Sequence, residues 1–316
     1  MTDFERSGPP LVSVILCVYN GERYLREAID CALHQTYPAV EVVVVDDGST
    51  DGTDAICRSY GDRIRHLPER HLGLAGARNL AIRSARGRYV AILDHDDHWH
   101  PEKLTRQVRL FFNRPKLGLV YSNYLQINPA AQVMEEKSAA ERGMRRGRVL
   151  PELYERNFIG NTTVVIPKPV LAEVGLFDER LCYSLDWDLW LRICHQHPID
   201  YVDEALASWR WRPNYAEDHH EIMLREAYQI VSTRQPRLAD RLTDAQNQSV
   251  ENRLARISFS LGRLYGRAGR VPTAIEWIQR SIRHEIFTPE QPRALKSLED
   301  LTALAAASSP PGRDGI

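Results

Sequence analysis

The segment YVAILDHDDHWHP, residues 89–101, carries the pattern that decides the fold. Its apolar run over residues 90–93 predicts a buried strand. Three acids, Asp94, Asp96 and Asp97, follow where that strand should end, and the chain then enters a helical pattern that starts at a proline. A buried strand that ends in acids and leads into a helix is typical of proteins in which strands and helices alternate.

The same alternation extends on both sides of this segment. Short β-branched runs are separated by stretches in which apolar residues recur at helical spacing. This order predicts an α/β fold, Rossmann-like, with a mostly parallel sheet covered by helices on both faces. Strands are expected within residues 11–20, 41–47, 64–68, 88–97 and 117–127, and helices at 22–35, 53–60, 73–85 and 101–113.

Composition excludes several classes of protein. The chain has 316 residues, of which 43% are hydrophobic, and a formal net charge of -1, which argues against a general nucleic-acid binder because such domains carry a basic excess. The five cysteines are scattered, without any CxxC pair, which favours reduced thiols and a cytoplasmic location. We see neither a signal peptide nor an apolar run of about 18 residues. The expectation is therefore a protein that is soluble or peripherally attached to a membrane.

The character of the sequence changes near residue 221. We expect a catalytic-type α/β domain over residues 1–220, a helical region over 221–308 and a disordered tail over 309–316. The stretch SFSLGRLYGRAGRVPTAIEWIQRSI, residues 258–282, is similar to one tetratricopeptide helical hairpin. These helices are a candidate surface for homo-oligomerisation. The polar, basic stretch over residues 130–148 is interpreted as a solvated loop or helix face, with a mobile lid or an acceptor-binding loop as the alternative.

Two acidic clusters fall at predicted strand ends, where ligands bind in parallel sheets. In DDGST, residues 46–50, the acids either close a turn or accept hydrogen bonds from a ligand. In DHDD, Asp94 and Asp96 are spaced i, i+2, so on an extended segment both carboxylates would point the same way and could converge on one cation. Hard oxygen ligands favour Mg²⁺ or Mn²⁺ over Zn²⁺. The alternative is that Asp97 caps the following helix while the other acids are solvated.

A third acidic element is LDWDLWLR, residues 185–192, at the start of a strongly apolar helix. Helix capping is the default explanation for Asp186 and Asp188. An ion pair of Asp186 with Arg192 is a second structural explanation. A catalytic base would have to lie at the helix start and face the cleft, and Asp186 fits that position better than Asp188.

These elements, in this order, resemble the inverting family 2 glycosyltransferases of GT-A fold. The resemblance spans residues 10–214 and rests on VSVILCVYNGERY, VVVVDDGSTDGT, GLAGARNLAIRSARGRYVAILDHDD, GLFDE and LDWDLWLR. It implies transfer of a hexose from a nucleotide-diphosphate sugar, with a UDP-sugar as the expected donor, to an acceptor hydroxyl. It also implies single displacement with inversion, a Mn²⁺ or Mg²⁺ cofactor, and a role in glycan or surface-polysaccharide biosynthesis.

The resemblance assigns a role to each matching position. Asp186 would be the catalytic base, and Asp96 and Asp97 would bind the metal. Arg210 and Arg212, in WRWRPN, are hypothesised to clamp the diphosphate, although Arg212 stands where the family commonly has His and Leu185 stands where it often has Glu. The nucleotide would contact residues from four segments, namely Cys17, Tyr19, Asp47, Arg78, Asp94 and Asp96.

The remaining partners follow by analogy with the family. The acceptor is expected to be a glycan or a lipid-linked precursor, used in the cytoplasm or at the inner face of the membrane, and nucleic acid is not expected as a partner. Two alternative functions stay open. One is a sugar nucleotidyltransferase, against which the absence of an N-terminal Gly-rich loop argues, and the other is a non-catalytic nucleotide-sugar-binding scaffold.

Overall fold

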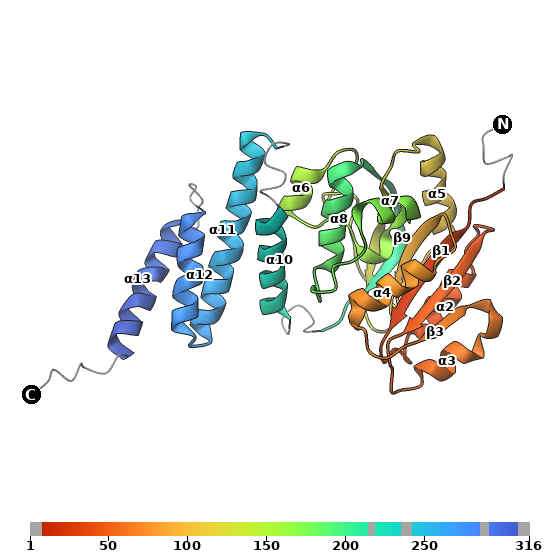
Figure 1. Cartoon of the computed structure of the whole chain (residues 1–316), viewed down its shortest axis with the longest axis horizontal. Coiled ribbons are helices and arrows are strands. Elements are labelled where there is room, and N and C mark those ends of the chain that lie inside the picture. The colour runs from red at the N-terminus through yellow and green to blue at the C-terminus, as the bar shows by residue number, and fades with distance from the viewer. Residues whose placement is uncertain (1–7, 214–218, 235–241, 285–290, 309–316) are drawn as a thin grey trace, which may run out of the picture. The chain divides into compact units, whose positions relative to one another are not determined.

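The structure is a computed structural model that describes residues 8–213, 219–234, 242–284 and 291–308. The chain divides into two compact units, Met1–Asn214 and Tyr215–Ile316, and each is described separately (Figure 1). The tail expected over residues 309–316 lies outside the described residues.

The first unit is built on one nine-stranded sheet. Its order is β3-β2-β1-β4-β8-β6-β9-β5, with β7 paired to β6. Strands β1 to β4 are mutually parallel, as are β6 and β9, whereas β8 runs antiparallel to both β4 and β6. The sheet is therefore mostly parallel, as predicted. The strands are β1 (Val12–Val18), β2 (Val40–Asp46), β3 (Arg65–Pro68), β4 (Tyr89–Asp94), β5 (His98–Trp99), β6 (Leu119–Ile127), β7 (Val133–Glu136), β8 (Val165–Pro167) and β9 (Ile199–Arg210).

Helices connect these strands along the chain of the first unit (Figure 1). The apolar residues of α2, α5 and the central strands share one core, in which the side chains of Val14, Ile29 and Val108 are buried. The helices are α2 (Leu25–Leu33), α3 (Thr53–Ser59), α4 (Gly73–Ser84), α5 (Lys103–Asn113), α6 (Leu150–Glu155), α7 (Lys168–Val174) and α8 (Leu185–Gln196), with 3-10 turns η1 (Gly61–Arg63) and η2 (Asn161–Thr163).

Strand register places the predicted site residues at one edge of the sheet. In the parallel pairs, Val18 lies opposite Asp46, and Cys17 lies opposite Asp94. The carboxyl ends of β1, β2 and β4 are thus level, so the acids that follow β2 and β4 lie at the same edge. This is the edge at which open parallel sheets bind ligands.

The second unit contains four helices in its described part. They are α10 (His220–Arg234), α11 (Asp244–Arg267), α12 (Val271–Arg283) and α13 (Gln291–Ser308). A three-residue turn joins α11 to α12, and Gly269 in that turn adopts a positive φ of 71°. Gly262 of α11 packs so closely on Ile278 of α12 that an added Cβ would lie 2.5 Å from Ile278 Cδ1. The predicted C-terminal helical region is present.

Several elements differ from the sequence-based expectation. Strand β9 was not predicted, because Asp200, Asp203 and Glu204 interrupt its apolar pattern. It pairs in parallel with β6 along most of its length, so cross-strand contacts outweigh weak local propensity. The helix α5 begins at Lys103, two residues after Pro101. The basic stretch 130–148 is not merely solvated, because it holds β7 and the buried side chain of Arg142.

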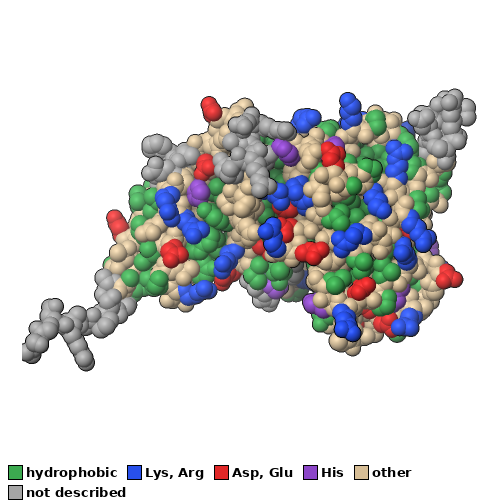
Figure 2. Space-filling view, in the orientation of Figure 1, with side chains coloured by type: hydrophobic (Ala, Val, Ile, Leu, Met, Phe, Trp, Pro, Cys, Tyr) green, Lys and Arg blue, Asp and Glu red, His purple; other side chains and the backbone are tan. Residues whose placement is uncertain are grey.

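The surface carries both signs of charge. Figure 2 shows Lys and Arg side chains interspersed with Asp and Glu over the visible face, in line with the net charge of -1. Among the described helices, none has the length and the apolar character needed to cross a bilayer.

Candidate active site

The DDGST turn and the start of α4 form one wall of the site. Both oxygens of Asp47 accept hydrogen bonds from backbone amides there, at 2.5 Å from Leu72 N and 3.0 Å from Gly73 N. Asp46 Oδ1 accepts from Ser49 N at 3.0 Å. Gly48 has a φ of +82°, and an added Cβ would come within 3.1 Å of His71 N. Asp47 therefore fixes the loop before α4, a structural role that the sequence did not indicate.

Tyr19 and Cys17 lie beside this wall. The Tyr19 side chain is 48% exposed, and its ring packs edge-on against His71 with centroids 4.8 Å apart. Burial raises the pKa of the Cys17 thiol to about 12; Arg78 lowers it, whereas Asp94 and Asp47 raise it. Arg78, Asp94 and Asp47 therefore lie close enough to Cys17 to act on its thiol. The structure thus brings these four residues, which the sequence analysis expected to contact the nucleotide, to one place.

Asp94 is held by partners from two other elements. Arg78 of α4 donates to Asp94 Oδ1 at 2.6 Å, and Asn161 Nδ2 donates to its two oxygens at 2.9 and 3.0 Å. Burial alone would raise the pKa of Asp94, but Arg78 and Asn161 outweigh it and leave the pKa below its usual value. Asp94 is consequently a fixed, ionised carboxylate.

The carboxylates of Asp94 and Asp96 do not point the same way from one extended strand, so this prediction is wrong. Strand β4 ends at Asp94, and the backbone then turns, with Asp97 N donating to Asp94 O at 3.1 Å. The two-residue alternation of a strand does not continue to Asp96. Asp96 instead faces Arg212, whose Nη2 and Nε lie 2.5 and 2.7 Å from Asp96 Oδ2.

Asp97 is the most deeply buried acid of this motif. Its Oδ1 accepts from Arg210 N at 2.9 Å, whereas its Oδ2 has no hydrogen-bond partner among the described residues. Burial, together with the charges of Asp94 and Asp96, raises the pKa of Asp97 well above its usual value, although hydrogen bonds from Arg210 N and the Thr162 side chain lower it. A buried carboxyl oxygen without a donor is costly unless a cation or a proton accompanies it.

The phosphate-clamp hypothesis is contradicted for Arg210. Its guanidinium is buried, donating to Glu27 Oε2 at 2.8 Å, Asp96 O at 2.6 Å and Pro129 O at 3.1 Å, and it stacks on Tyr24 with 4.2 Å to the ring centroid. These contacts make Arg210 a structural cation. Arg212, whose side chain is about half exposed, is the remaining candidate.

The first turn of α8 carries two acids, Asp186 and Asp188, that have different surroundings. Asp188 is 2% exposed and pairs with Arg192 Nε at 2.9 Å. Asp186 is partly exposed and accepts from Trp187 N at 2.6 Å and from Asn157 Nδ2 at 3.3 Å. The ion pair therefore belongs to Asp188 and not to Asp186, which leaves Asp186 as the acid that faces the cleft.

The acidity of Asp186 reflects its burial. Burial raises the pKa of Asp186 to about 6, while the Trp187 N–H, Arg78 and Asn157 lower it and Asp94 raises it. A carboxyl with a pKa near the operating pH suits general-base catalysis.

Asp186 shares one cavity with Asp94. This cavity has a volume of 430 Å³ and is lined by both Asp94 and Asp186. Tyr124 of β6 and Trp209 of β9 also line it, and Trp209 is 40% exposed. An exposed aromatic side chain beside two carboxylates is an arrangement that suits a sugar ring, which has an apolar face and a polar rim.

Sequence reasoning missed part of this cavity. The loop between α6 and β8 supplies Asn157, which contacts Asp186, and Asn161, which contacts Asp94. The signal was the stretch NFIGNTT, residues 157–163, in which two amides precede a predicted strand. Only the fold shows that these amides reach acids 29 and 67 residues away.

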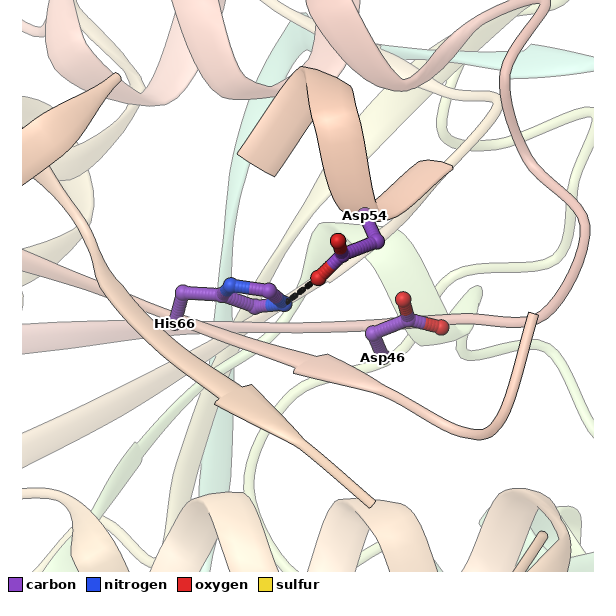
Figure 3. Close-up of side chains that lie close together, drawn as sticks. All are labelled: Asp46, Asp54 and His66. Carbon is purple, nitrogen blue, oxygen red and sulfur yellow. Dashed lines mark ion pairs between the residues drawn. The ribbon is translucent and has the colours of Figure 1, made fainter. Parts of the chain in front are cut away.

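A second group of possible cation ligands lies elsewhere. Ligand atoms of Asp46, Asp54 and His66 fall within 4.8 Å of one another (Figure 3). Asp54 already pairs with Arg58 at 2.7 Å, and His66 Nε2 lies 4.0 Å from Asp54 Oδ1. None of the three lines the cavity that contains Asp186, although Asp46 belongs to the DDGST turn at the edge of the sheet.

The curled, mostly parallel sheet and the acids at its carboxyl edge define a GT-A-like glycosyltransferase. The sequence model of the family described as glycosyl transferase family 2 matches residues 13–177 of this chain. The chain belongs to this family.

Individual relatives agree with this assignment. The chain is 43% identical over 206 residues to TuaG of Bacillus subtilis, a glycosyltransferase assigned to teichuronic acid biosynthesis, covering 64% of this chain and 79% of TuaG. It is 30% identical over 253 residues to WfgD of Escherichia coli, a UDP-Glc:alpha-D-GlcNAc-diphosphoundecaprenol beta-1,3-glucosyltransferase, covering 79% of this chain and 91% of WfgD. It spans between 29% and 64% of the length of five matching Rickettsia glycosyltransferases.

A solved structure shows the same fold. S. aureus TarS residues 1–349, in complex with UDP-GlcNAc, superposes with a TM-score of 0.64 at 19% sequence identity, over 94% of this chain and 91% of that chain. The α/β class predicted from the sequence is confirmed.

Proposed function

We propose that this chain is an inverting, metal-dependent hexosyltransferase that moves a sugar from a nucleotide-diphosphate sugar to an acceptor hydroxyl. The observation that carries the proposal is the placement of Asp186. It lines the same 430 Å³ cavity as Asp94, and its pKa is about 6. A base for single displacement needs this placement, within reach of both the acceptor and the donor.

Asp186 acts as the general base. It accepts the proton of the acceptor hydroxyl at a carboxylate oxygen while that hydroxyl oxygen attacks the anomeric carbon of the donor. The bond from the anomeric carbon to the diphosphate breaks in the same step, and the configuration inverts. Asn157, at 3.3 Å from Asp186 Oδ2, orients the carboxylate.

The donor nucleotide binds at the ends of β1, β2 and β4. Tyr19 offers an exposed ring for the base, and Asp47 is fixed by the amides of Leu72 and Gly73 and keeps lone pairs for a base N–H. Arg78 supplies a positive charge beside Asp94. A UDP-sugar is the donor we expect, in keeping with the UDP-Glc named for WfgD.

The residues of the DHDD motif fit a hard divalent cation. Asp97 Oδ2 is buried without a donor among the described residues, and the pKa of Asp97 is raised by burial and by its acidic neighbours. Asp96 and Asp97 would hold Mn²⁺ or Mg²⁺ through carboxylate oxygens. When bound, the cation neutralises charge on the departing diphosphate.

We also propose a place for this reaction in surface-polysaccharide biosynthesis, with a glycan or a lipid-linked acceptor. The support is the similarity to WfgD, which is named for a diphosphoundecaprenol-linked acceptor, and to TuaG. A cytoplasmic location with peripheral membrane association, and self-association through α10 to α13, are part of the same proposal. Flotation with vesicles and sedimentation velocity measure these two properties directly.

Nucleotide binding tests the proposal. Calorimetric titration with UDP and with GDP, each with and without Mn²⁺, should show binding that depends on the metal. No metal-dependent binding of either nucleotide would refute the enzyme assignment and favour a scaffold.

A further inference from the structure

Part of the cavity next to Asp186 is lined by cations that no proposed step of the donor reaction uses. Arg142, Arg156 and Lys137 all line it, and Arg156 directly precedes Asn157, the residue that contacts Asp186. Arg142 and Lys137 come from the basic stretch after β6, far from Arg156 in sequence. The fold therefore gathers three positive charges in the chamber that holds the candidate base.

Arg142 is an unusual cation because it is buried and forms no ion pair with an acid in the described part of the chain. Its side chain is 8% exposed, and its guanidinium carbon lies 3.7 Å from the centroid of the Tyr124 ring. Arg142 Nη2 donates to Tyr124 O at 2.9 Å, whereas Nε has no hydrogen-bond partner among the described residues. A buried guanidinium that lacks a counter-ion is costly, so an anion bound nearby would stabilise it.

Arg156 is exposed and also lacks an acidic partner. Its guanidinium makes no ion pair with any residue in the described part of the chain. The other arginines around the site differ in this respect. Arg78, Arg192 and Arg212 lie 2.6, 2.9 and 2.5 Å from the carboxylates of Asp94, Asp188 and Asp96.

The acids near this cavity form hydrogen bonds and ion pairs with groups other than these two arginines, although the charge of Arg142 helps to lower the pKa of Glu141. Asp94 is paired with Arg78, and Lys137 Nζ lies 2.5 Å from Glu135 Oε1. Glu141 Oε2 accepts from Ser138 N at 2.8 Å and from Ser138 Oγ at 2.7 Å. Among the described residues, Arg142 and Arg156 are thus the cations of this cavity that form no ion pair with a carboxylate, and they can receive an anionic group from outside the protein.

We propose that the acceptor carries an anionic group, a phosphate or a carboxylate, that Arg142 and Arg156 bind while Asp186 receives the proton of its hydroxyl. The inference rests on the proposed function and adds the substrate class. Guanidinium groups bind both kinds of anion through charge-assisted hydrogen bonds. Fixing the anion would place the acceptor hydroxyl relative to Asp186, which makes Arg142 and Arg156 positioning residues.

The test uses inorganic phosphate as the probe and the full chain loaded with UDP and Mg²⁺, so that the nucleotide site is filled. Calorimetry should detect phosphate binding to the wild-type chain. Arg156→Gln should weaken that binding about tenfold, the loss expected for one charge-assisted hydrogen bond. Arg156→Lys should restore part of it. Arg109→Gln is the matched control, because Arg109 is an exposed arginine of α5 outside the cavity, and it should bind phosphate like the wild type.

Two further results would overturn the inference. Equal phosphate affinity of Arg156→Gln and the wild type, with UDP binding intact, would remove the anion site but leave the glycosyltransferase assignment standing. Selective loss of UDP-glucuronate binding relative to UDP-glucose in Arg156→Gln would place the anion on the transferred sugar and not on the acceptor. A chain that binds no UDP at all would instead contradict the proposed function itself.

Discussion

The carboxyl group of Asp186 illustrates how one residue links burial to chemistry. Because burial raises its pKa to about 6, the group is protonated below that pH and ionised above it. A general base acts only in its ionised form.

The first prediction concerns the pH dependence of kcat. Transfer should fall about tenfold for each pH unit below 6 and level off above it, since the fraction of ionised Asp186 follows that course. Initial rates between pH 4.5 and 8.5 at saturating donor, metal and acceptor check this. A rate that rises as the pH falls below 6 would mean that the essential group is an acid and not this base.

A second prediction at the residue scale decides where the metal binds. Mn²⁺ with UDP should raise the Tm of the wild-type chain by about 5 °C at a concentration 100 times the dissociation constant. Asp97→Asn should abolish the part of the Tm shift that requires Mn²⁺, because a neutral amide takes the place of the carboxylate that contains the buried Oδ2.

Asp54→Asn is the matched control for this measurement. It removes an acid from the second group of possible ligands, Asp46, Asp54 and His66, and it should leave the Mn²⁺ shift unchanged. Retention of the shift in Asp97→Asn together with its loss in Asp54→Asn would move the metal to the second group.

At this scale the sequence could predict residue types but not all of their roles. It favoured Asp186 over Asp188 as the base, which stays a prediction, and it offered Asp186 as the partner of Arg192, whereas the structure pairs Arg192 with Asp188. It could not show that Arg210 would be buried against Glu27 and Tyr24, because those partners lie 183 and 186 positions away.

Helix α8 is the element that carries both acids. Arg192 contacts Asp188 and also donates to the carbonyls of Val174, Gly175 and Leu176, which ties α8 to the end of α7. Asp186 lies one helical position before Trp187 and faces the cavity. Two acids on the first turn thus differ: Asp188 has a structural partner in Arg192, and Asp186 is the proposed base.

The third prediction separates these two roles. Asp188→Ala should lower the free energy of unfolding by about 3 kcal/mol, because it leaves the largely buried Arg192 cation without its carboxylate. Denaturant unfolding followed by circular dichroism measures the change. Unaltered stability combined with lost transfer would reverse the assignment and make Asp188 the reactive acid.

Helices and strands whose own residues carry a clear apolar pattern could be predicted from the sequence. A strand that depends on pairing with a strand far away in the chain could not. The β1, β2 and β4 strands and helices α2 and α4 show clear apolar periodicity, and each was expected within a few residues of its observed bounds. Strand β9 depends on β6, which precedes it by more than 70 residues, so its charged sequence alone gave no strand signal.

The division of the whole molecule into two units bears on where activity resides. All the proposed donor, metal and base residues lie in Met1–Asn214. That unit also contains the large apolar core shared by the sheet and its helices. The second unit has its own smaller core of Phe259, Ile278 and Ala294.

The fourth prediction follows from this division. A chain that ends at Asn214 should keep metal-dependent UDP binding with an affinity within about threefold of the full chain, because each unit has its own core. Calorimetry on both chains gives the comparison, and sedimentation velocity shows whether the second unit sets the oligomeric state. Loss of UDP binding in a folded truncated chain would show that the helices contribute to the donor site.

The central claim is that Asp186 is the base of a sugar transfer, and Asp186→Asn tests it most directly. The variant should bind the donor nucleotide with unchanged affinity yet release or transfer its sugar at least about a thousandfold more slowly than the wild type. Its free energy of unfolding at pH 8 should rise by about 1–2 kcal/mol, since a partly buried carboxylate with a raised pKa destabilises the fold above that pKa. Sugar-nucleotide turnover by Asp186→Asn at the wild-type rate would contradict the account.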